Sequence, residues 1–470
     1  MWMPVPIIGY GVFMKKKKNS LTAAKFMALG FAVAILVGSI LLWLPISSAD
    51  GTSVPYVDAL FTATTSLCVT GLVTVPTFST WSLFGKIVIL ILIQLGGLGI
   101  VTCGTIAFVV LGKRISIKTR KLVQESYNLE HMSGMVKLVI RIVIGTLVVE
   151  TIGAIFYCFS FVPEYGWAKG IWYSVFNSVS AFCNAGIDIL GPDSLRPYVT
   201  NVPVNLTTMF LIVMGGIGFV VWWDIGGRMR TLLKKEMHPK QFVTKLELHT
   251  RIVIVMTALM IFTGAAVIMT LEFGNPKTIG NLSFGEKVLA SLFQSVTTRT
   301  AGFETIAQSD FTDATSMFHM LLMFIGGSPM GTAGGIKTTT IAVLFLTTVA
   351  YFRGKKHTEV FGRRLPEENI RTAIVVVVTG VIVLFSAIIT LSVASQGEHL
   401  DVAYEIVSAL ATVGLSRGFT STLTVAGKIV VILVMYLGRI GPITLASAVV
   451  VRSHEANVHI ERPVRRILVG

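Results

Sequence analysis

Four glycine-centred segments recur along the chain and could together supply rings of backbone carbonyl groups. They surround Gly71, Gly186, Gly302 and Gly414 and read TTSLCVTGLVT, SVSAFCNAGIDI, SVTTRTAGFET and SALATVGLSRG, at intervals of 115, 116 and 112 residues. Rings of carbonyl oxygens can replace the hydration shell of a cation, and glycine tolerates the φ and ψ angles that aim them at one axis. The repetition therefore predicts a cation filter built from four loops of one chain.

The filter prediction extends to the two residues before each glycine. The predicted K⁺-coordinating carbonyls are those of Val69, Thr70 and Gly71; Asn184, Ala185 and Gly186; Thr300, Ala301 and Gly302; and Thr412, Val413 and Gly414. The last copy keeps the Thr-Val-Gly core of potassium-channel filters, but all four lack the tyrosine and second glycine of that signature. A shorter filter follows, with one strong site beside the glycines. Selectivity for potassium over sodium does not follow from these residues, because the physical origin of that selectivity is debated.

A second glycine motif runs in step with the first. It reads QLGGLGIVT (94–102), VMGGIGFVV (213–221), FIGGSPMGT (324–332) and YLGRIGPIT (436–444), and it follows the filter glycines by 25, 29, 24 and 24 residues. A single glycine-rich stretch in a membrane helix usually means close helix packing. Two motifs repeated together four times favour a pore.

The third copy of this motif continues as GGSPMGTAGGIKTTT (326–340). Pro329 removes a backbone donor and five glycines add flexibility, which predicts a non-helical loop at mid-membrane. A kinked but continuous helix is the alternative, although 35 residues (316–350) at 1.5 Å each exceed one bilayer. Lys337 is expected to bond the loop's carbonyls or to sit at its cytoplasmic end, with a snorkelling lysine as the alternative.

Arg439 stands where the other copies of the motif have Gly97, Gly216 and Gly327. A buried arginine in a membrane is costly and usually faces a partner or a watery cavity. Below a cation filter, its charge is expected to repel permeating ions or to pair with loop carbonyls, and either would hold a gate shut. A structural clamp between repeats is the alternative.

The elements that must position these residues are membrane helices. The chain is 53% hydrophobic and 13% charged, about half the usual charged fraction of soluble domains. The segments that precede the glycines (56–67, 170–182, 285–298 and 401–411) are too short to span a bilayer and suit re-entrant helices. Full spans flank them, at 25–45, 137–162, 250–272 and 370–395 before and at 83–111, 204–225, 316–350 and 426–451 after. We therefore expect an all-α polytopic protein with four helix–pore-loop–helix repeats around a central pore, eight spans and four re-entrant pore helices.

The expected division of the chain follows from these repeats. It is a cytoplasmic N-terminus (1–24), pore repeat 1 (25–111), a cytoplasmic loop (112–136), repeat 2 (137–225), a second loop (226–249), repeat 3 with its intramembrane loop at 326–340 (250–350), a third loop (351–369), repeat 4 (370–451) and a cytoplasmic C-terminus (452–470).

The net charge of +15 does not indicate nucleic-acid binding, because of where it lies. The N-terminus and the segments 112–141, 226–251, 353–371 and 452–466 hold 29 of the 39 Lys and Arg residues. By the positive-inside rule, both termini are predicted to be cytoplasmic, and no cleavable signal peptide is apparent. The intervening outer segments are net acidic, which either concentrates cations at a pore mouth or reflects an ordinary polar loop face.

Other functional classes find little support. The four cysteines and eight histidines lack metal-ligand spacing, and GKKH (354–357) lacks the pattern of a phosphate-binding loop. A membrane enzyme or receptor would need a catalytic cluster of His, Asp or Glu at membrane depth, and the sequence contains none. We expect no enzymatic activity and no organic cofactor in this chain.

The four degenerate pore loops, together with TTRTAGF and the following GGSPMGTAGGIKTTT, resemble the Trk/Ktr/HKT superfamily of potassium transporters, most closely the membrane subunit of the bacterial Ktr system. The resemblance covers about residues 20–460. It implies potassium uptake across the bacterial cell membrane, often as a sodium-dependent symport, by a homodimer with one pore in each protomer. It also implies a cytosolic ring of nucleotide-binding, RCK-type regulatory subunits, so any nucleotide control would come from that partner.

The resemblance further assigns roles to residues. It implies an intramembrane gate at Gly326, Gly327, Ser328, Pro329, Gly331, Gly334, Gly335 and Lys337, with Arg439 beside it. Plant sodium-selective relatives replace the first filter glycine by serine, so Gly71 favours potassium as the transported ion. A sodium-permeable or mixed sodium and potassium transporter of the same fold is the alternative.

Overall fold

The computed structural model describes residues 23–111, 135–236 and 238–441. The predicted cytoplasmic N-terminus up to residue 22, most of the loop 112–136, and the chain from residue 442 onward lie outside the described residues. Those predictions therefore stay predictions.

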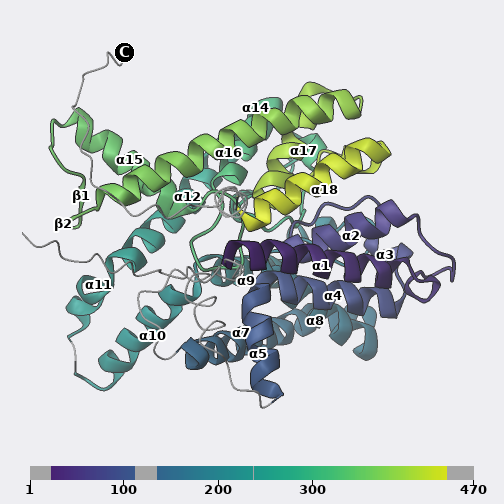
Figure 1. The fold of residues 1–470 in the computed structure, drawn as a ribbon, viewed down its shortest axis with the longest axis horizontal. Coiled ribbons are helices and arrows are strands. Elements are labelled where there is room, and N and C mark those ends of the chain that lie inside the picture. Colours follow the sequence, from purple (N-terminus) through teal and green to yellow (C-terminus); the bar gives the residue numbers. More distant parts are fainter. Residues whose placement is uncertain (1–22, 112–134, 237, 442–470) are drawn as a thin grey trace, which may run out of the picture.

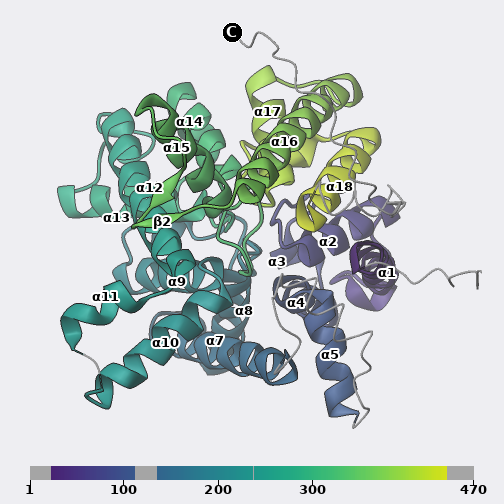
Figure 2. The same cartoon turned by 60° about the vertical axis from the view of Figure 1, so that its left-hand side comes forward.

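The described chain is a bundle of helices in four sequential groups (Figures 1 and 2). Each group begins with a long helix, continues with a short one and ends with one or two helices that face its neighbours. Group 1 holds α1 (Ala23–Trp43), α2 (Tyr56–Cys68), α4 (Leu83–Leu98) and α5 (Ile100–Val110). Group 2 holds α7 (Met135–Tyr165), α8 (Trp167–Cys183), α9 (Val202–Gly216) and α10 (Phe219–Leu233). Group 3 holds α12 (Leu248–Glu272), α13 (Phe284–Thr297), α14 (Asp313–Phe324) and α15 (Thr338–Phe352), and group 4 holds α16 (Glu367–Ala394), α17 (His399–Ala411) and α18 (Val425–Ile440).

The long first helix of each group is apolar enough to cross a membrane. Among the described residues these candidate spans are Lys25–Trp43, Val136–Tyr165, Leu248–Glu272 and Glu367–Ala394. Large apolar side chains lie on their outer surfaces, as on α16, where Phe385, Ile389 and Val393 are 61, 66 and 86% exposed. Exposed apolar surface of this extent suits lipid rather than water. The chain is therefore an all-helical polytopic membrane protein.

Two of the helices predicted to follow the glycines are not continuous spans. In place of a span over 83–111, α4 ends at Leu98 and α5 leaves at 101°; in place of one over 204–225, α9 and α10 meet at 99°. Gly99 and Gly218 lie at the two breaks and have φ of 83° and 93°. Glycine adopts such positive φ angles at little cost, whereas other residues are strained there. Counting each bent pair as one span gives up to six candidate spans in the described residues.

The short second helices form the centre of the bundle. Ten of the 13 residues of α2 are buried, and so are the last eight residues of α17. The C-terminal ends of α2, α8, α13 and α17 are all buried among the longer helices. These ends carry the glycine segments.

A small hairpin contains the only two strands among the described residues. Strands β1 (Glu359–Val360) and β2 (Arg363–Arg364) pair antiparallel between α15 and α16. Short accessory helices, α3 (Thr77–Thr80) and α11 (Phe242–Lys245), lie in connecting segments.

Candidate functional site

The four predicted filter segments come together as a closed ring of backbone. Each glycine lies so close to the residue before the glycine of another group that an added Cβ atom would collide with its carbonyl oxygen. The pairs run in one direction around the ring: Gly71 against Ala185, Gly186 against Ala301, Gly302 against Val413, and Gly414 against Thr70. Segments more than 100 residues apart thus share one axis, and none of the four positions has room for a side chain.

The backbone of the ring alternates in conformation. The glycines have φ of 98°, 63°, 81° and 96°, and the residues two places earlier, Val69, Asn184, Thr300 and Thr412, have φ of 55°, 60°, 71° and 53°. Positive φ at non-glycine residues is rare and costs free energy, so the surrounding structure must enforce it. Alternation between positive and negative φ turns successive carbonyl groups to the same side of the chain. That is the arrangement a carbonyl-lined passage needs.

Hydroxyl groups of the short helices hold this conformation in place. The Gly71 and Gly414 N–H groups each donate to a hydroxyl six residues earlier, on Thr65 and Ser408, at 3.0 Å. In group 2 the Ile187 N–H donates to Ser180 Oγ at 3.1 Å. A buried N–H without a partner is costly, so these hydroxyls favour the ring conformation.

The third glycine segment is held by a different hydrogen bond. Helix α13 ends at Thr297, five residues before Gly302, whereas the other three short helices end three residues before their glycines. Thr297 donates its hydroxyl to the Phe303 carbonyl at 2.7 Å. The two extra residues and this reversed hydrogen bond distinguish the third loop from the others.

The second glycine motif supports the short helices from outside. A Cβ atom on Gly96, Gly215 or Gly438 would collide with the carbonyl of the penultimate residue of α2, α8 or α17, namely Leu67, Phe182 and Leu410. The glycines therefore allow the outer helix to touch the end of the short helix directly. Gly326 differs, because it packs against Gly334 of its own loop.

A cavity of about 320 Å³ adjoins the residues that follow the four glycines. Its charged lining residues are Asp188, Asp193, Arg196 and Glu304. Arg196 donates to Glu304 at 2.8 Å, and burial raises the pKa of Asp188 to about 6 against hydrogen bonds that lower it. Three carboxyl groups against one guanidinium make this lining acidic, which attracts cations.

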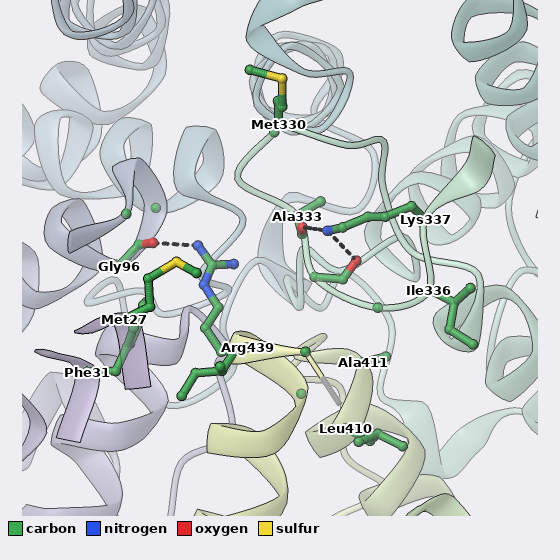
Figure 3. A pocket seen from close by; sticks show the side chains of 18 of the residues that line it. Met27, Phe31, Gly96, Met330, Ala333, Ile336, Lys337, Leu410, Ala411 and Arg439 are labelled. Atoms are coloured by element: carbon green, nitrogen blue, oxygen red, sulfur yellow. Dashed lines mark hydrogen bonds between the residues drawn. The ribbon is translucent and has the colours of Figure 1, made fainter. Parts of the chain in front are cut away.

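A second cavity, of about 450 Å³, lies against Leu410 and Ala411, which precede Gly414 at the end of α17 (Figure 3). It is lined by the glycine motifs of α4 and α18, by Leu410 and Ala411 of α17, and by the segment Ile325–Lys337, which is not helical. Lys337 and Arg439 bring the charges of this cavity. The two cavities therefore differ in sign across the ring.

The segment Ile325–Lys337 is fastened to itself and to group 2. Within it, the Gly326 N–H donates to the Ile336 carbonyl at 3.0 Å, and the Ser328 and Thr338 hydroxyls are 2.9 Å apart. Toward group 2, the Ser328 and Thr332 N–H groups donate to the carbonyls of Gly216 and Gly215 at 2.9 and 3.0 Å. The loop is thus a defined structure beneath the ring.

Two cations complete this loop (Figure 3). Lys337 Nζ donates to the Ala333 carbonyl at 2.7 Å, within the loop itself. Arg439 reaches from α18 to the Thr332 carbonyl at 2.6 Å with Nη1 and to the Gly96 carbonyl with Nη2. One guanidinium from group 4 therefore ties the loop of group 3 to group 1.

Comparison with known proteins gives the family. The protein-family model described as "TrkH: Cation transport protein" matches residues 13–459 of this chain. The chain belongs to the TrkH family. It is 40% identical to the Ktr system potassium uptake protein B of Bacillus subtilis, over 90% of this chain and 92% of that protein. It is 38% identical to the potassium/sodium uptake protein NtpJ of Enterococcus hirae, over 98% of this chain and all of that one.

A solved structure shares the fold. The potassium transporter TrkH from Vibrio parahaemolyticus matches with a TM-score of 0.73 at 18% identity, covering 93% of this chain and 86% of that one. The family model and the two relatives confirm the resemblance to the Trk/Ktr/HKT superfamily. Membership of the TrkH family makes this chain a cation transport protein of the membrane, not an enzyme.

Several supporting residues of this TrkH-family chain escaped sequence reasoning. The hydroxyl residues six places before a glycine, Thr65, Ser180 and Ser408, recur in three repeats and carried a readable signal. So did the third glycine of the second motif, which marks the helix breaks at Gly99 and Gly218. No sequence signal indicated the partners of Arg439, because they lie 107 and 343 residues away along the chain.

Proposed function

We propose that this chain takes up potassium through the axis enclosed by the four glycine segments. The observation that carries the proposal is the closed ring, in which each of the four glycines meets the carbonyl of another repeat. The names of the two relatives, a potassium uptake protein and a potassium/sodium uptake protein, support potassium as the transported ion. In this proposal the ion exchanges water for the carbonyl oxygens of the 12 predicted filter residues, with its strongest site at the glycines.

Four helix ends favour a cation at this ring. Helices α2, α8, α13 and α17 all terminate within five residues of the glycines, and the C-terminal end of a helix carries a partial negative charge equivalent to roughly half an electron. Together with the acidic lining of the cavity beyond the ring, they offset part of the cost of stripping water from the ion.

The loop Ile325–Lys337 and Arg439 are proposed to form the gate. They lie in the cavity on the other side of the ring, where a fixed positive charge repels permeating cations. Arg439 bonds carbonyls of groups 1 and 3, so opening the passage requires these bonds to break. We propose that a cytosolic nucleotide-binding regulatory ring moves the helices that break them, as in a Ktr system.

The proposed topology follows from the bent and short helices. The bent outgoing helices, α4–α5 and α9–α10, line the cavity as halves of broken spans, and the four short helices enter the membrane without crossing it. We propose eight spans in all, cytoplasmic termini and a homodimer. The basic segments 226–249 and 351–369 then face the cytoplasm.

Sodium enters the proposal in two ways. In the first, the chain takes up potassium by sodium-dependent symport. A sodium-permeable transporter is the second candidate, and the similarity to the potassium/sodium uptake protein of Enterococcus hirae favours it. Competition between the two ions in uptake assays separates these possibilities.

Growth of an uptake-deficient bacterial host at low potassium tests the function. The chain, expressed with a Ktr-type regulatory subunit, should restore growth, whereas Gly302→Ser should not, because its Cβ atom collides with the Val413 carbonyl at a φ of 81°. Gly285→Ser is the matched control, since Gly285 lies in the same repeat with open space around it. Absence of rescue by the wild-type chain, when it is present in the membrane, would refute the proposal.

A further inference from the structure

A small basic cavity lies where α15 ends and α16 begins, apart from the glycine ring. It has a volume of about 200 Å³, and four of its lining residues can be cationic: Lys355, Lys356, His357 and Arg364. They come from the turn after α15 and from β2. The transport pathway proposed above makes no use of this cavity.

The cavity is held open by fixed contacts. Thr358 Oγ1 donates to Thr347 Oγ1 of α15 at 3.3 Å, and the Leu365 N–H donates to the Thr358 carbonyl at 2.9 Å. Thr358 and Leu365 are both buried. The hairpin is thus fastened to α15 from below, and the basic side chains are carried on a positioned backbone.

The charges of the cavity are available to an anion. Lys355 pairs with Glu359 at 3.6 Å and Arg364 with Glu367 at 3.4 Å, and all four side chains are more than half exposed. Exposed ion pairs of this kind contribute little free energy because water screens them, so a phosphate can compete for the cations. Lys356 makes no ion pair within the described ranges, which leaves its charge uncompensated.

The surroundings of the cavity indicate a membrane surface. Helix α16 is a candidate span that begins at Glu367, and α15 is an apolar helix that ends at Phe352. The last two residues of α15, Tyr351 and Phe352, are 81 and 82% exposed. Exposed aromatic residues at the end of an apolar helix are typical of the lipid headgroup level.

We propose that this cavity binds the phosphate of an anionic phospholipid from the cytoplasmic leaflet. The inference uses the orientation proposed above, in which the segment 351–369 faces the cytoplasm. Basic pockets beside transmembrane helices on that side suit anionic headgroups. A free phosphate ion has the same charge chemistry, but it gains nothing from Tyr351 and Phe352, whose rings lie where acyl chains and headgroups meet.

The position of the cavity gives this lipid a route to the gate. Helix α15 joins the two directly: it begins at Thr338, immediately after the loop Ile325–Lys337, and ends beside the cavity. A bound headgroup would fix the far end of that helix relative to α16.

Lipid retention by the purified full-length chain tests the proposal without any transport assay. The protein is titrated with phosphatidylglycerol or neutral phosphatidylcholine in detergent, and bound lipid is counted by native mass spectrometry. The triple variant Lys355→Gln/Lys356→Gln/Arg364→Gln should lose affinity for phosphatidylglycerol by more than about tenfold, since each surface cation contributes about fivefold. The control triple Lys234→Gln/Lys235→Gln/Lys240→Gln removes three exposed cations elsewhere and should retain it.

The outcomes separate the possible ligands. Equal lipid retention by the variant and the control would overturn the proposal, as would stabilisation by inorganic phosphate that equals that by phosphatidylglycerol. Loss of binding to a regulatory subunit with lipid retention unchanged would make the surface a protein-docking site instead. If the triple variant does not fold, Lys356→Gln alone should still weaken phosphatidylglycerol binding several-fold. Unchanged lipid retention in that single variant would overturn the proposal too.

Discussion

The glycine ring and the loop beneath it are both non-helical backbone inside a bundle of apolar helices, yet they are held in different ways. The ring is built from four similar segments, which are supported by glycines, hydroxyl groups and backbone contacts. The loop Ile325–Lys337 occurs once; backbone hydrogen bonds join it to group 2, and the Arg439 guanidinium bridges it to groups 1 and 4. Backbone packing resists displacement, whereas two hydrogen bonds from one arginine can be broken together. The difference suggests a fixed filter above a releasable gate.

The largest effect is expected from breaking the ring itself with Gly414→Ala. The new Cβ atom would collide with the Thr70 carbonyl at a φ of 96°, and a strained φ alone costs about 1–3 kcal/mol. Potassium uptake should fall by at least about tenfold, or discrimination against sodium should be lost. Rubidium uptake with sodium competition measures both.

Gly418→Ala is the control for this variant. Gly418 has nearly the same φ, 93°, but open space around it, so it carries the backbone strain without the collision. Equal loss of uptake in both variants would show that strain in the fourth loop, and not closure of the ring, explains the result.

Arg439→Ala should have the next largest effect, in the opposite direction. The substitution removes two charge-assisted hydrogen bonds, each worth about 1.5–3 kcal/mol, and a positive charge from the inner cavity. Uptake in the absence of the regulatory subunit should rise by about tenfold. Arg439→Lys keeps the charge but not the two-armed bridge, so it separates repulsion from bonding. Unchanged or lower uptake by Arg439→Ala, at normal expression, would contradict a role in gating.

Ser408→Ala is expected to weaken the ring moderately. It leaves the buried Gly414 N–H without the hydroxyl that now accepts its hydrogen bond, at a cost of about 1–3 kcal/mol. Selectivity for potassium over sodium should fall by roughly three- to tenfold, with uptake retained. Ser421→Ala, at an exposed position on the same loop, should leave the ion competition profile as in the wild type.

Lys337→Gln should have the smallest effect of the four. Its ammonium group bonds carbonyls of its own loop, at Ala333 and Gly334, and ties it to no other repeat. Glutamine can still donate one of these bonds, so we expect uptake to rise by only about twofold. A rise as large as that of Arg439→Ala would place the gate's main restraint inside the loop.

Sequence reasoning went furthest where the molecule repeats itself. The four glycines and their intervals predicted which segments would be comparable, and the structure has those segments on one axis. The outgoing helices predicted over 83–111 and 204–225 are present, but they are bent by 101° and 99° at Gly99 and Gly218, the third glycine of each motif. Periodicity in hydrophobicity does not show such a bend, although the glycines mark its place.

What occurs once was harder to predict. The charge of Arg439 was conspicuous as an exception among glycines, but its partners belong to groups 1 and 3 and are backbone carbonyls, which every residue has. The end of α13 at Thr297, which leaves two extra residues before Gly302, was not predicted from the local sequence. Contacts between distant repeats need the three-dimensional arrangement.

Anomalous diffraction from crystals grown in rubidium salt tests the central claim most directly. Rubidium replaces potassium at carbonyl sites, and its anomalous signal locates the ion without assumptions about the pathway. We expect a peak on the axis of the ring, surrounded by the carbonyls of Thr70, Ala185, Ala301 and Val413. An empty ring in protein that transports rubidium, with the peak elsewhere among the helices, would contradict the account.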